Sequence, residues 1–179
     1  MIVEKPIYQT IDVGNYTITL LTKEEYLKNK ELIPSVKSLW WLRSPGIGVN
    51  RVAIVYGEYG NVYSAGGNVY VGAGVRPAFK IEHCGQLKLG EKVIIKDSYF
   101  TVLNDGTFIL NTKDLYFTVL NDGILLCDTI VDETMFDKAS NNYDKSYIKQ
   151  WLEKWAEDKL SGKREALWRE TQSQLSFGF

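Results

Sequence analysis

The sequence predicts a single α+β domain, and three observations lead to this prediction. The chain has 179 residues, which suits one domain and is too short for two ordinary ones. A hydrophobic share of 45% with only 4 prolines is typical of a chain that folds around a core. Short strand patterns punctuated by glycine fill residues 39–79, and a helical pattern covers 143–160, so strands and helices are expected together.

Two elements are expected before the glycine-rich segment. Residues 16–21 (Y-T-I-T-L-L) are rich in β-branched residues and alternate enough for a strand. Thr22 followed three residues later by Glu25 is a capping-box pattern, so a short helix is expected from about Lys23. Pro34 cannot continue a helix and should end this one.

The segment 39–79 is expected to form a small antiparallel sheet with long loops. Its strand patterns cover residues 52–56, 61–63, 68–71 and 75–81. The glycines between these strands are typical of hairpin turns and bulges.

An eight-residue sequence, Y-F-T-V-L-N-D-G, occurs twice, at 99–106 and at 116–123. Each copy is a strand pattern that ends in Asp-Gly, which favours a tight hairpin turn. Two copies are too few for a solenoid, which needs about three units. The repeat therefore indicates a tandem duplication that lengthens one hairpin.

An amphipathic helix is expected after Asn141 and Asn142, which are good helix caps. Its predicted apolar face consists of Tyr147, Ile148, Trp151, Leu152 and Trp155. Gly162 is placed to end the helix. Residues 163–179 are expected to form a further helix or a tail.

Composition argues against several classes of function. The 21 Lys and Arg residues nearly balance the 22 Asp and Glu residues, so a surface that coats nucleic acid is not expected. The N-terminus lacks a basic stretch followed by an apolar run, and no window reaches the roughly 18 apolar residues of a membrane span. We therefore expect a soluble, unexported, cytoplasmic protein without a membrane partner.

The sequence has too few cysteines and histidines for a disulfide scaffold or for the common zinc sites, and it lacks the parts of a catalytic triad. Cys84 and Cys127 are too few for a disulfide scaffold or for a cysteine-only zinc site of about four ligands. His83 is the single histidine, so a three-histidine metal site is excluded, and Ser44 has no histidine-like base near it in sequence. No phosphate loop or metal-spaced cluster is present. We predict no catalytic residue, no metal and no cofactor.

Two motifs resemble a known family. They are W-W-L-R-S-P-G at 40–46 and G-V-R-P-A-F at 74–79, with a glycine-rich middle between them. The pair resembles the C-type-lectin-like domains of bacterial and phage proteins of unknown function (the DUF6273 type). These are related in fold to the variable proteins of diversity-generating retroelements and, more distantly, to formylglycine-generating enzymes. The resemblance implies a C-type-lectin-like fold, with small twisted antiparallel sheets, long glycine-rich loops and about two flanking helices.

The order of the remaining motifs indicates a circular permutation. In the commoner layout of that family, a strand of the f-x-V-L-x-x-g-x-x-L-L kind and a helix of the Y-x-x-S-x-I-x-x-W-L kind precede W-W-L-R-S-P-G. Here the matching residues 117–126 and 143–152 follow it. The first and last strands of such a fold pair side by side, so a short link, here 84–90, costs little loop-closure entropy.

The resemblance also implies a domain plan. A C-type-lectin-like domain is expected over 1–162, built from the halves 16–82 and 88–160, with the C-terminal tail outside it. If the chain is permuted, residues 75–81 should pair with a strand from the 93–120 region.

The middle segment, residues 50–70, holds the predicted ligand-binding residues. They are Asn50, Arg51, Glu58, Tyr59, Asn61, Tyr63, Ser64, Asn68 and Tyr70. Tyrosine supplies a large contact area with few rotors to freeze, and Asn and Ser supply adaptable hydrogen bonds. In the resembled variable proteins this stretch contacts the ligand. An ordinary wet β-surface with cross-strand tyrosine pairs explains the same composition, and both interpretations stay open.

A second group, Trp40, Trp41, Arg43, Arg76 and Pro77, is expected to be structural. A tryptophan pair that enters a strand beside Pro-Gly is more typical of a core than of a ligand site. Arg43 or Arg76 is expected to be buried against a carboxylate or carbonyl groups, where the several donors of a guanidinium tie loops together.

The expected function is non-enzymatic binding. We expect a phage- or prophage-encoded module, in the host cytoplasm or in a virion, that recognises a protein or glycan through residues 50–70. The alternative is an intracellular phage effector of the anti-CRISPR kind, which inhibits a host enzyme or defence complex. A homo-oligomer stays open. The copper-binding cysteine pair of formylglycine-generating enzymes is not expected, because neither Cys84 nor Cys127 lies in the middle segment.

Overall fold

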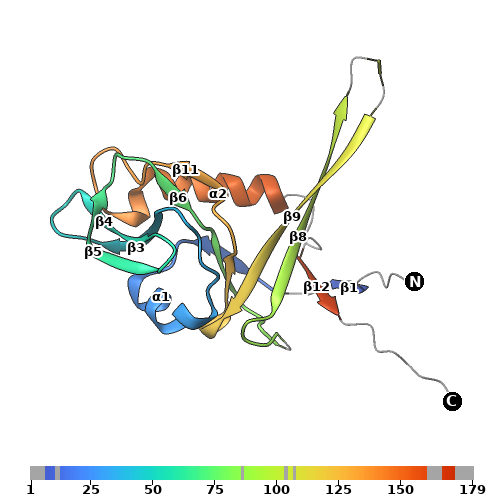
Figure 1. Cartoon of the computed structure of the whole chain (residues 1–179), viewed down its shortest axis with the longest axis horizontal. Coiled ribbons are helices and arrows are strands. Elements are labelled where there is room, and N and C mark those ends of the chain that lie inside the picture. The colour runs from blue at the N-terminus through green and yellow to red at the C-terminus, as the bar shows by residue number, and fades with distance from the viewer. Residues whose placement is uncertain are drawn as a thin grey trace.

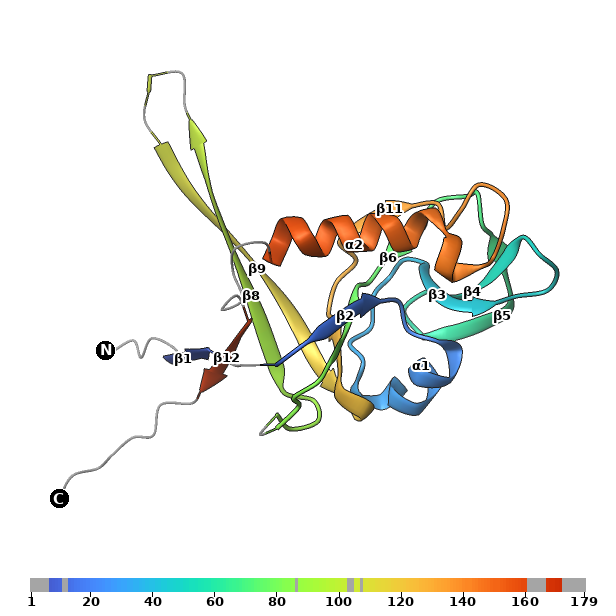
Figure 2. The same cartoon turned by 180° about the vertical axis from the view of Figure 1, so that it is seen from behind.

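Strand-forming runs from both ends and from the middle of the chain assemble into two sheets, accompanied by two α-helices (Figures 1 and 2). The computed structural model describes residues 7–10, 13–85, 87–102, 105–106, 108–160 and 167–171. Within these ranges, side chains are described over 13–85, 87–95, 105–106 and 114–160. The α+β class is therefore confirmed.

The larger sheet has seven strands, all joined antiparallel. In spatial order they are β1 (Ile7–Thr10), β12 (Leu167–Thr171), β8 (Lys92–Val102), β9 (Phe108–Leu120), β10 (Ile124–Cys127), β7 (Ala78–Ile81) and β2 (Tyr16–Thr19). Strands from the start, middle and end of the chain therefore share one hydrogen-bonded layer.

The smaller sheet has five strands, and one of its pairs, β3 with β6, is parallel. In spatial order they are β11 (Asp132–Thr134), β6 (Ala73–Val75), β3 (Trp40–Pro45), β4 (Arg51–Tyr56) and β5 (Asn61–Asn68). β5 lies at one edge of this sheet, and it carries much of the predicted binding segment.

The strand β7 has a different partner from the one predicted. It pairs with β10 on one side and with β2 on the other, so the prediction that residues 75–81 pair with a strand from 93–120 was wrong. The reason is the Asp-Gly turn after β9, which brings β10 back alongside β9 and so places it next to β7.

The first helix follows its sequence signals. α1 spans Lys23–Asn29, and a 3₁₀ turn over Lys30–Leu32 follows it before Pro34. The capping box is present, because Thr22 Oγ1 accepts from the Glu25 N–H at 3.0 Å and Glu25 Oε2 accepts from the Thr22 N–H at 2.9 Å.

The second helix, α2 (Tyr147–Leu160), begins later than expected. A 3₁₀ turn, Tyr143–Lys145, precedes it, and Ser146 Oγ rather than an asparagine accepts from the Lys149 N–H at 3.2 Å. Its fully buried stripe follows i, i+4 spacing: Ile148, Leu152, Ala156 and Leu160. Trp151 and Trp155 are only half-buried and flank the stripe, and Tyr147 is exposed, so the apolar face is rotated from the predicted one.

Two further expectations were wrong. Residues 68–71 are not a separate strand, since β5 ends at Asn68 and the Val71 N–H closes a turn onto the Asn68 carbonyl at 3.2 Å. The C-terminal segment was expected to be a helix or a tail. Its described part, Leu167–Thr171, instead forms strand β12 between β1 and β8. Gly162, predicted to end α2, lies outside the described residues.

The core contains two clusters, and β3 contributes to both. Trp41 packs in the cluster that includes both sheets and α2, edge-on to Phe136 at 5.7 Å between ring centroids. Trp40 packs in the other cluster, edge-on to Tyr26 of α1 at 5.4 Å. Successive residues of a strand point to opposite faces, so the tryptophan pair joins the two clusters through one strand.

The duplicated segment forms the same hairpin twice. The first copy pairs Phe100 with Leu110 across β8 and β9, and the second pairs Phe117 with Cys127 across β9 and β10. Each partner in the second hairpin lies seventeen positions after its counterpart in the first. The repeat extends beyond its identical core to K-D-S-Y-F-T-V-L-N-D-G-T-F-I-L-N-T (96–112) and K-D-L-Y-F-T-V-L-N-D-G-I-L-L-C-D-T (113–129).

The two copies lie in different places. The second copy is in the sheet, where Phe117, Val119 and Leu125 are buried. The first copy forms an arm, residues 96–102 of β8 and 108–112 of β9, that extends away from the other strands (Figures 1 and 2). The two copies are therefore equivalent in backbone pairing and different in location.

We predict that deleting residues 96–112 leaves the rest of the fold intact. The deletion joins Ile95 to Lys113, so Lys113 and Asp114 become a two-residue turn between Ile95 and Leu115, which already face each other across β8 and β9. The shortened protein should unfold cooperatively in urea, with a free energy of unfolding within about 1 kcal/mol of the full chain. Loss of the cooperative transition would show that the arm is required for folding.

Deletion of residues 113–129 is the matched comparison, because it also leaves one copy. The first copy then has to occupy the sheet, with Ser98 in the place of buried Leu115 and Asn111 in the place of Asp128. Replacing a buried leucine by a small side chain typically costs about 2–5 kcal/mol. This variant should therefore be clearly less stable than the first, and equal stability would contradict the assignment of the second copy as the structural one.

Glu25 joins α1 to both sheets. Its carboxylate pairs with Lys80 of β7 and lies 3.6 Å from Arg43 Nη2 of β3. Burial raises the pKa of Glu25, but the hydrogen bonds from Lys80 and the Thr22 N–H and the charges of Lys80 and Arg43 together lower it below 4.5.

We predict that Glu25→Gln lowers the free energy of unfolding by about 1 kcal/mol at pH 7. Glutamine keeps the capping box, so the loss reports the charge. Because the folded-state pKa is depressed, the stabilisation is present above the unfolded-state pKa and disappears as pH falls through the folded-state pKa. Urea unfolding from pH 7 to pH 3 should show the wild type and variant converging, whereas exposed Glu24→Gln should change little.

Candidate functional site

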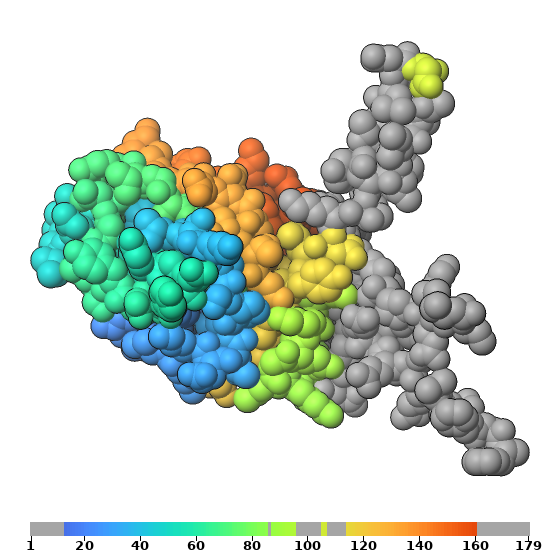
Figure 3. All heavy atoms as spheres, in the orientation of Figure 1, coloured from blue at the N-terminus to red at the C-terminus, as the bar shows by residue number. Residues whose placement is uncertain are grey.

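Exposed apolar and aromatic side chains concentrate in one segment. Among the residues with described side chains, thirteen large hydrophobic residues are exposed, and seven of them lie between positions 47 and 71. We call these seven the tyrosine surface: Ile47, Val49, Tyr56, Tyr59, Tyr63, Tyr70 and Val71. Figure 3 shows the cyan-to-green atoms of this segment gathered at one end of the molecule.

The β4–β5 hairpin positions three members of the tyrosine surface, Tyr56, Tyr59 and Tyr63, near its turn. Tyr63 lies opposite Ile54, and Tyr56 lies opposite Asn61. Ile54 is 6% exposed, whereas Tyr63 is 51% and Tyr56 is 62% exposed, so the hairpin runs from the core into solvent. Tyr59, at 81%, lies in the turn that joins the two strands.

A bulge in β5 separates this exposed end from the buried end. The pairing passes from Val52 with Gly67 to Ile54 with Tyr63, so β5 holds extra residues there. Gly66 in this bulge has φ of +89°, and a Cβ would lie 2.5 Å from the Val52 carbonyl oxygen. Arg51 Nη1 donates to the Gly66 carbonyl at 3.0 Å and fixes the bulge. Only glycine fits this position without strain.

The structure brings most of the predicted ligand-binding residues to the surface. Seven of the nine are exposed: Asn50, Glu58, Tyr59, Asn61, Tyr63, Ser64 and Tyr70. Arg51 and Asn68 are half-buried, and both take part in backbone geometry, Arg51 at the bulge and Asn68 at the turn that ends β5.

The predicted set of ligand-binding residues leaves out four members of the tyrosine surface. Ile47, Val49 and Val71 are apolar residues of turns and loops, which composition alone does not separate from core residues. Tyr56 was assigned to a strand, and its position at the exposed end of β4 could have been inferred from the glycine that follows it.

The residues expected to be structural are buried or half-buried and form hydrogen bonds with the backbone of other segments. Trp40 and Trp41 are almost fully buried, and the Trp41 indole Nε1–H donates to the Thr134 carbonyl at 2.9 Å. Pro77 is buried, and its carbonyl accepts from the Cys127 N–H at 2.9 Å. Arg43 is half-buried, and its Nε donates to the Leu20 carbonyl at 3.0 Å.

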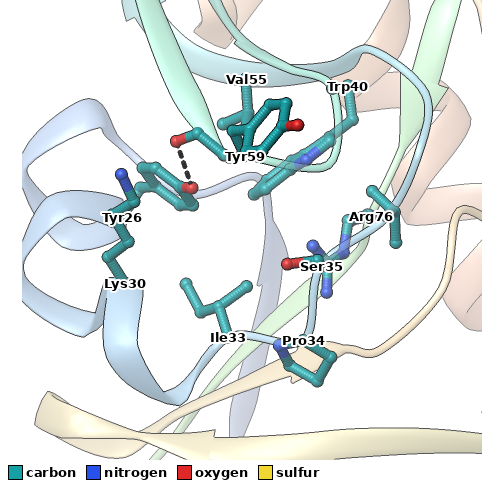
Figure 4. Close-up of a pocket in the computed structure, with 12 residues that line it drawn as sticks. Tyr26, Lys30, Ile33, Pro34, Ser35, Trp40, Val55, Tyr59 and Arg76 are labelled. Atoms are coloured by element: carbon teal, nitrogen blue, oxygen red, sulfur yellow. Dashed lines mark hydrogen bonds between the residues drawn. The ribbon is translucent and has the colours of Figure 1, made fainter.

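A small hollow lies next to Tyr59, with an empty volume of about 300 Å³ that includes space open to solvent. Figure 4 shows Tyr26 and Lys30 on one side of it, Trp40 and Arg76 on the other, and Ile33 and Pro34 below. The Tyr26 hydroxyl donates to the Gly60 carbonyl at 2.7 Å and so holds the β4–β5 turn against α1.

The two cysteines are not placed as a pair. Cys84 is exposed and Cys127 is buried, and both are free thiols. Burial raises the pKa of the Cys127 thiol, so it stays protonated and is a poor nucleophile or metal ligand. Among the residues that the structure describes, no group of three or more His, Cys, Asp or Glu side chains could hold a metal ion.

No described helix is long and apolar enough to cross a bilayer. Comparison with protein-family models, with curated proteins and with solved structures finds no match to this chain.

We predict that the tyrosine surface adds little to stability. Tyr59→Ala, Tyr63→Ala and Tyr70→Ala should each change the free energy of unfolding by less than about 1 kcal/mol, because these side chains are more than half exposed. Trp41→Ala, fully buried, should cost about 3–5 kcal/mol. Urea unfolding of the four variants measures this, and a loss of that larger size at Tyr63 would make it a core residue instead.

Proposed function

We propose that this chain is a non-enzymatic binding module that recognises a protein or glycan partner through the tyrosine surface. The observation that carries the proposal is the concentration of seven exposed hydrophobic residues within positions 47–71. Clusters of exposed apolar side chains on soluble proteins mark interaction sites. Tyrosine is enriched at such sites because it combines an apolar ring with a hydroxyl that can hydrogen-bond.

The competing interpretation, a wet surface stabilised by tyrosine pairs, has less support. None of the ring contacts found between described side chains joins two of Tyr56, Tyr59, Tyr63 and Tyr70. Instead, these rings leave most of their area in solvent. Burying that area against a partner would be favourable at about 25 cal/mol per Å² of apolar surface, before the costs of association.

Polar groups around the rings suit recognition. Asn61 and Ser64 are exposed on β5, next to Tyr63, and Asn50 is exposed at the start of β4. Their amides and hydroxyls can exchange water for a partner's hydrogen-bonding groups. The surface therefore combines apolar anchors with adaptable polar contacts, as binding surfaces do.

We further propose that the fold is C-type-lectin-like and circularly permuted. Two features support this. β10 belongs to the hairpin that would open the unpermuted layout, and it pairs directly with β7, which would close it. The chain passes between the halves, from β7 to β8, through a short connection that contains the expected link. In this arrangement the tyrosine surface occupies the position of the ligand-contacting stretch of the resembled variable proteins.

The experiment is affinity capture from lysate of candidate host bacteria, followed by affinity measurement with the purified partner. Tyr63→Ala and Tyr59→Ala should each weaken binding by about 2 kcal/mol if they are hot spots, with unchanged unfolding behaviour. Tyr147→Ala on α2 is the matched control, because Tyr147 is also exposed but lies outside the tyrosine surface. A partner whose affinity is unchanged by both β4–β5 variants, or reduced equally by the control, would contradict the proposal.

A further inference from the structure

The hollow beside Tyr59 is lined by positive charge without a balancing carboxylate. Of its twelve lining residues, two are cationic, Lys30 and Arg76, and none is acidic. Three are large aromatics, Tyr26, Trp40 and Tyr59. The exposed Glu58 is in the same turn as Tyr59 but does not line the hollow.

Arg76 is the unusual member, because it is a charged side chain with only 1% of its surface exposed. Its Nε donates to the Cys127 carbonyl at 3.0 Å, and its Nη2 donates to the Asp128 carbonyl at 3.2 Å. The guanidinium carbon also lies 4.6 Å from the centre of the Trp40 ring. These contacts use neutral acceptors and a ring face, so they orient the guanidinium without cancelling its charge.

The rest of the guanidinium has no anionic partner within the described part of the chain. No ion pair of Arg76 is found there, and Nη1 has no hydrogen-bond acceptor among those residues. The Asp128 carboxylate is engaged elsewhere, by Lys92 and by the Thr118 hydroxyl. Figure 4 shows the guanidinium nitrogens beside Ser35, at the edge of the hollow.

Burial of a cation without a paired anion is energetically unfavourable, and the pKa of Arg76 reflects this. Burial lowers that pKa to about 10, although the nearby Cys127, Asp128 and Tyr26 act in the opposite direction. The side chain is still charged at pH 7. A bound anion would supply the missing compensation, and a guanidinium fork fits the two oxygens of a carboxylate or phosphate.

We infer that the hollow is a binding site for one oxyanion group, a carboxylate or a phosphate, held by Arg76, with Lys30 on the opposite wall adding positive charge (Figure 4). This rests on the proposed function, because the group would be carried by the partner that covers the tyrosine surface. Tyr59 belongs to both places, since it is a member of that surface and also lines the hollow. The partner's anionic group would enter beside Tyr59 while its neighbouring parts lie on the tyrosine surface.

The first test uses small probes and no partner. Sodium acetate and sodium phosphate are titrated separately at pH 7 into the ¹⁵N-labelled protein, against sodium chloride at matched ionic strength. We expect saturable shifts of the Arg76 Nε–H and the Trp40 indole N–H with at least one oxyanion. A response to acetate identifies a carboxylate source, and a response to phosphate alone identifies a phosphorylated one. No response to either, or the same response to chloride, overturns the site.

Variants locate the site. Arg76→Lys keeps the charge and loses the fork, so it should weaken the responding anion by at least about tenfold. Because Arg76 also donates hydrogen bonds to the Cys127 and Asp128 carbonyls, cooperative unfolding of this variant in urea is checked first. Lys30→Gln leaves the hydrogen bonds of Arg76 in place and should weaken anion binding by about threefold.

Lys37→Gln is the matched control, because Lys37 is exposed, lies one residue beyond the lining residue Val36, and changes net charge equally. It should leave the anion affinity unchanged. Equal effects of the Lys30 and Lys37 variants would show a response to overall charge and would overturn the site. If these titrations fail, the effect of the tyrosine variants on partner affinity still tests the proposed function. The two proposals can therefore be contradicted independently of each other.

Discussion

The arrangement of the whole structure depends on burying β3 on both faces. Trp40 and Trp41 are adjacent, so one must enter each core cluster, and both are almost fully buried. This requires one layer of structure on either side of the five-stranded sheet: α1 and its 3₁₀ turn on the Trp40 side, and Phe136 with α2 on the Trp41 side. The β4–β5 hairpin is anchored by its buried residues Val52 and Ile54, and its turn end, with Tyr56, Tyr59 and Tyr63, is exposed to solvent.

Elements whose interacting residues are close in the sequence could be predicted from local sequence signals. The Thr22–Glu25 capping box, the helix that ends before Pro34 and the antiparallel pairing of the strands before and after each Asp-Gly were predicted and found, because each depends on residues close together in the sequence. Elements that depend on distant partners were missed. β12 is a strand because β1 and β8 lie on its two sides, and nothing local in 163–179 indicates either neighbour.

The candidate site divides in the same way. Tyr59, Tyr63 and Tyr70 could be identified from composition, since tyrosines among glycines have few neighbours to bury them. The hollow could not be predicted, because its walls come from Lys30 after α1 and Arg76 after β6, and only the fold places these two cations on opposite sides of one hollow (Figure 4). Arg76 was expected to be held by carboxylate or carbonyl groups, and the carbonyls of Cys127 and Asp128 are its acceptors. The fold decides between those two acceptor types, and because carbonyl groups are neutral, the positive charge of Arg76 stays available to an anion.

The register of the β8–β9 pair places the first residues of the two repeat units opposite one another. Each unit begins with Lys-Asp, and where the arm joins the rest of the sheet the two dipeptides are paired antiparallel, with Lys96 opposite Asp114 and Asp97 opposite Lys113. Opposite charges at directly facing positions favour an antiparallel pair, and like charges oppose it. A dipeptide of one positive and one negative residue is complementary to its own reverse, so two identical units can face each other in antiparallel register with opposite charges at each position.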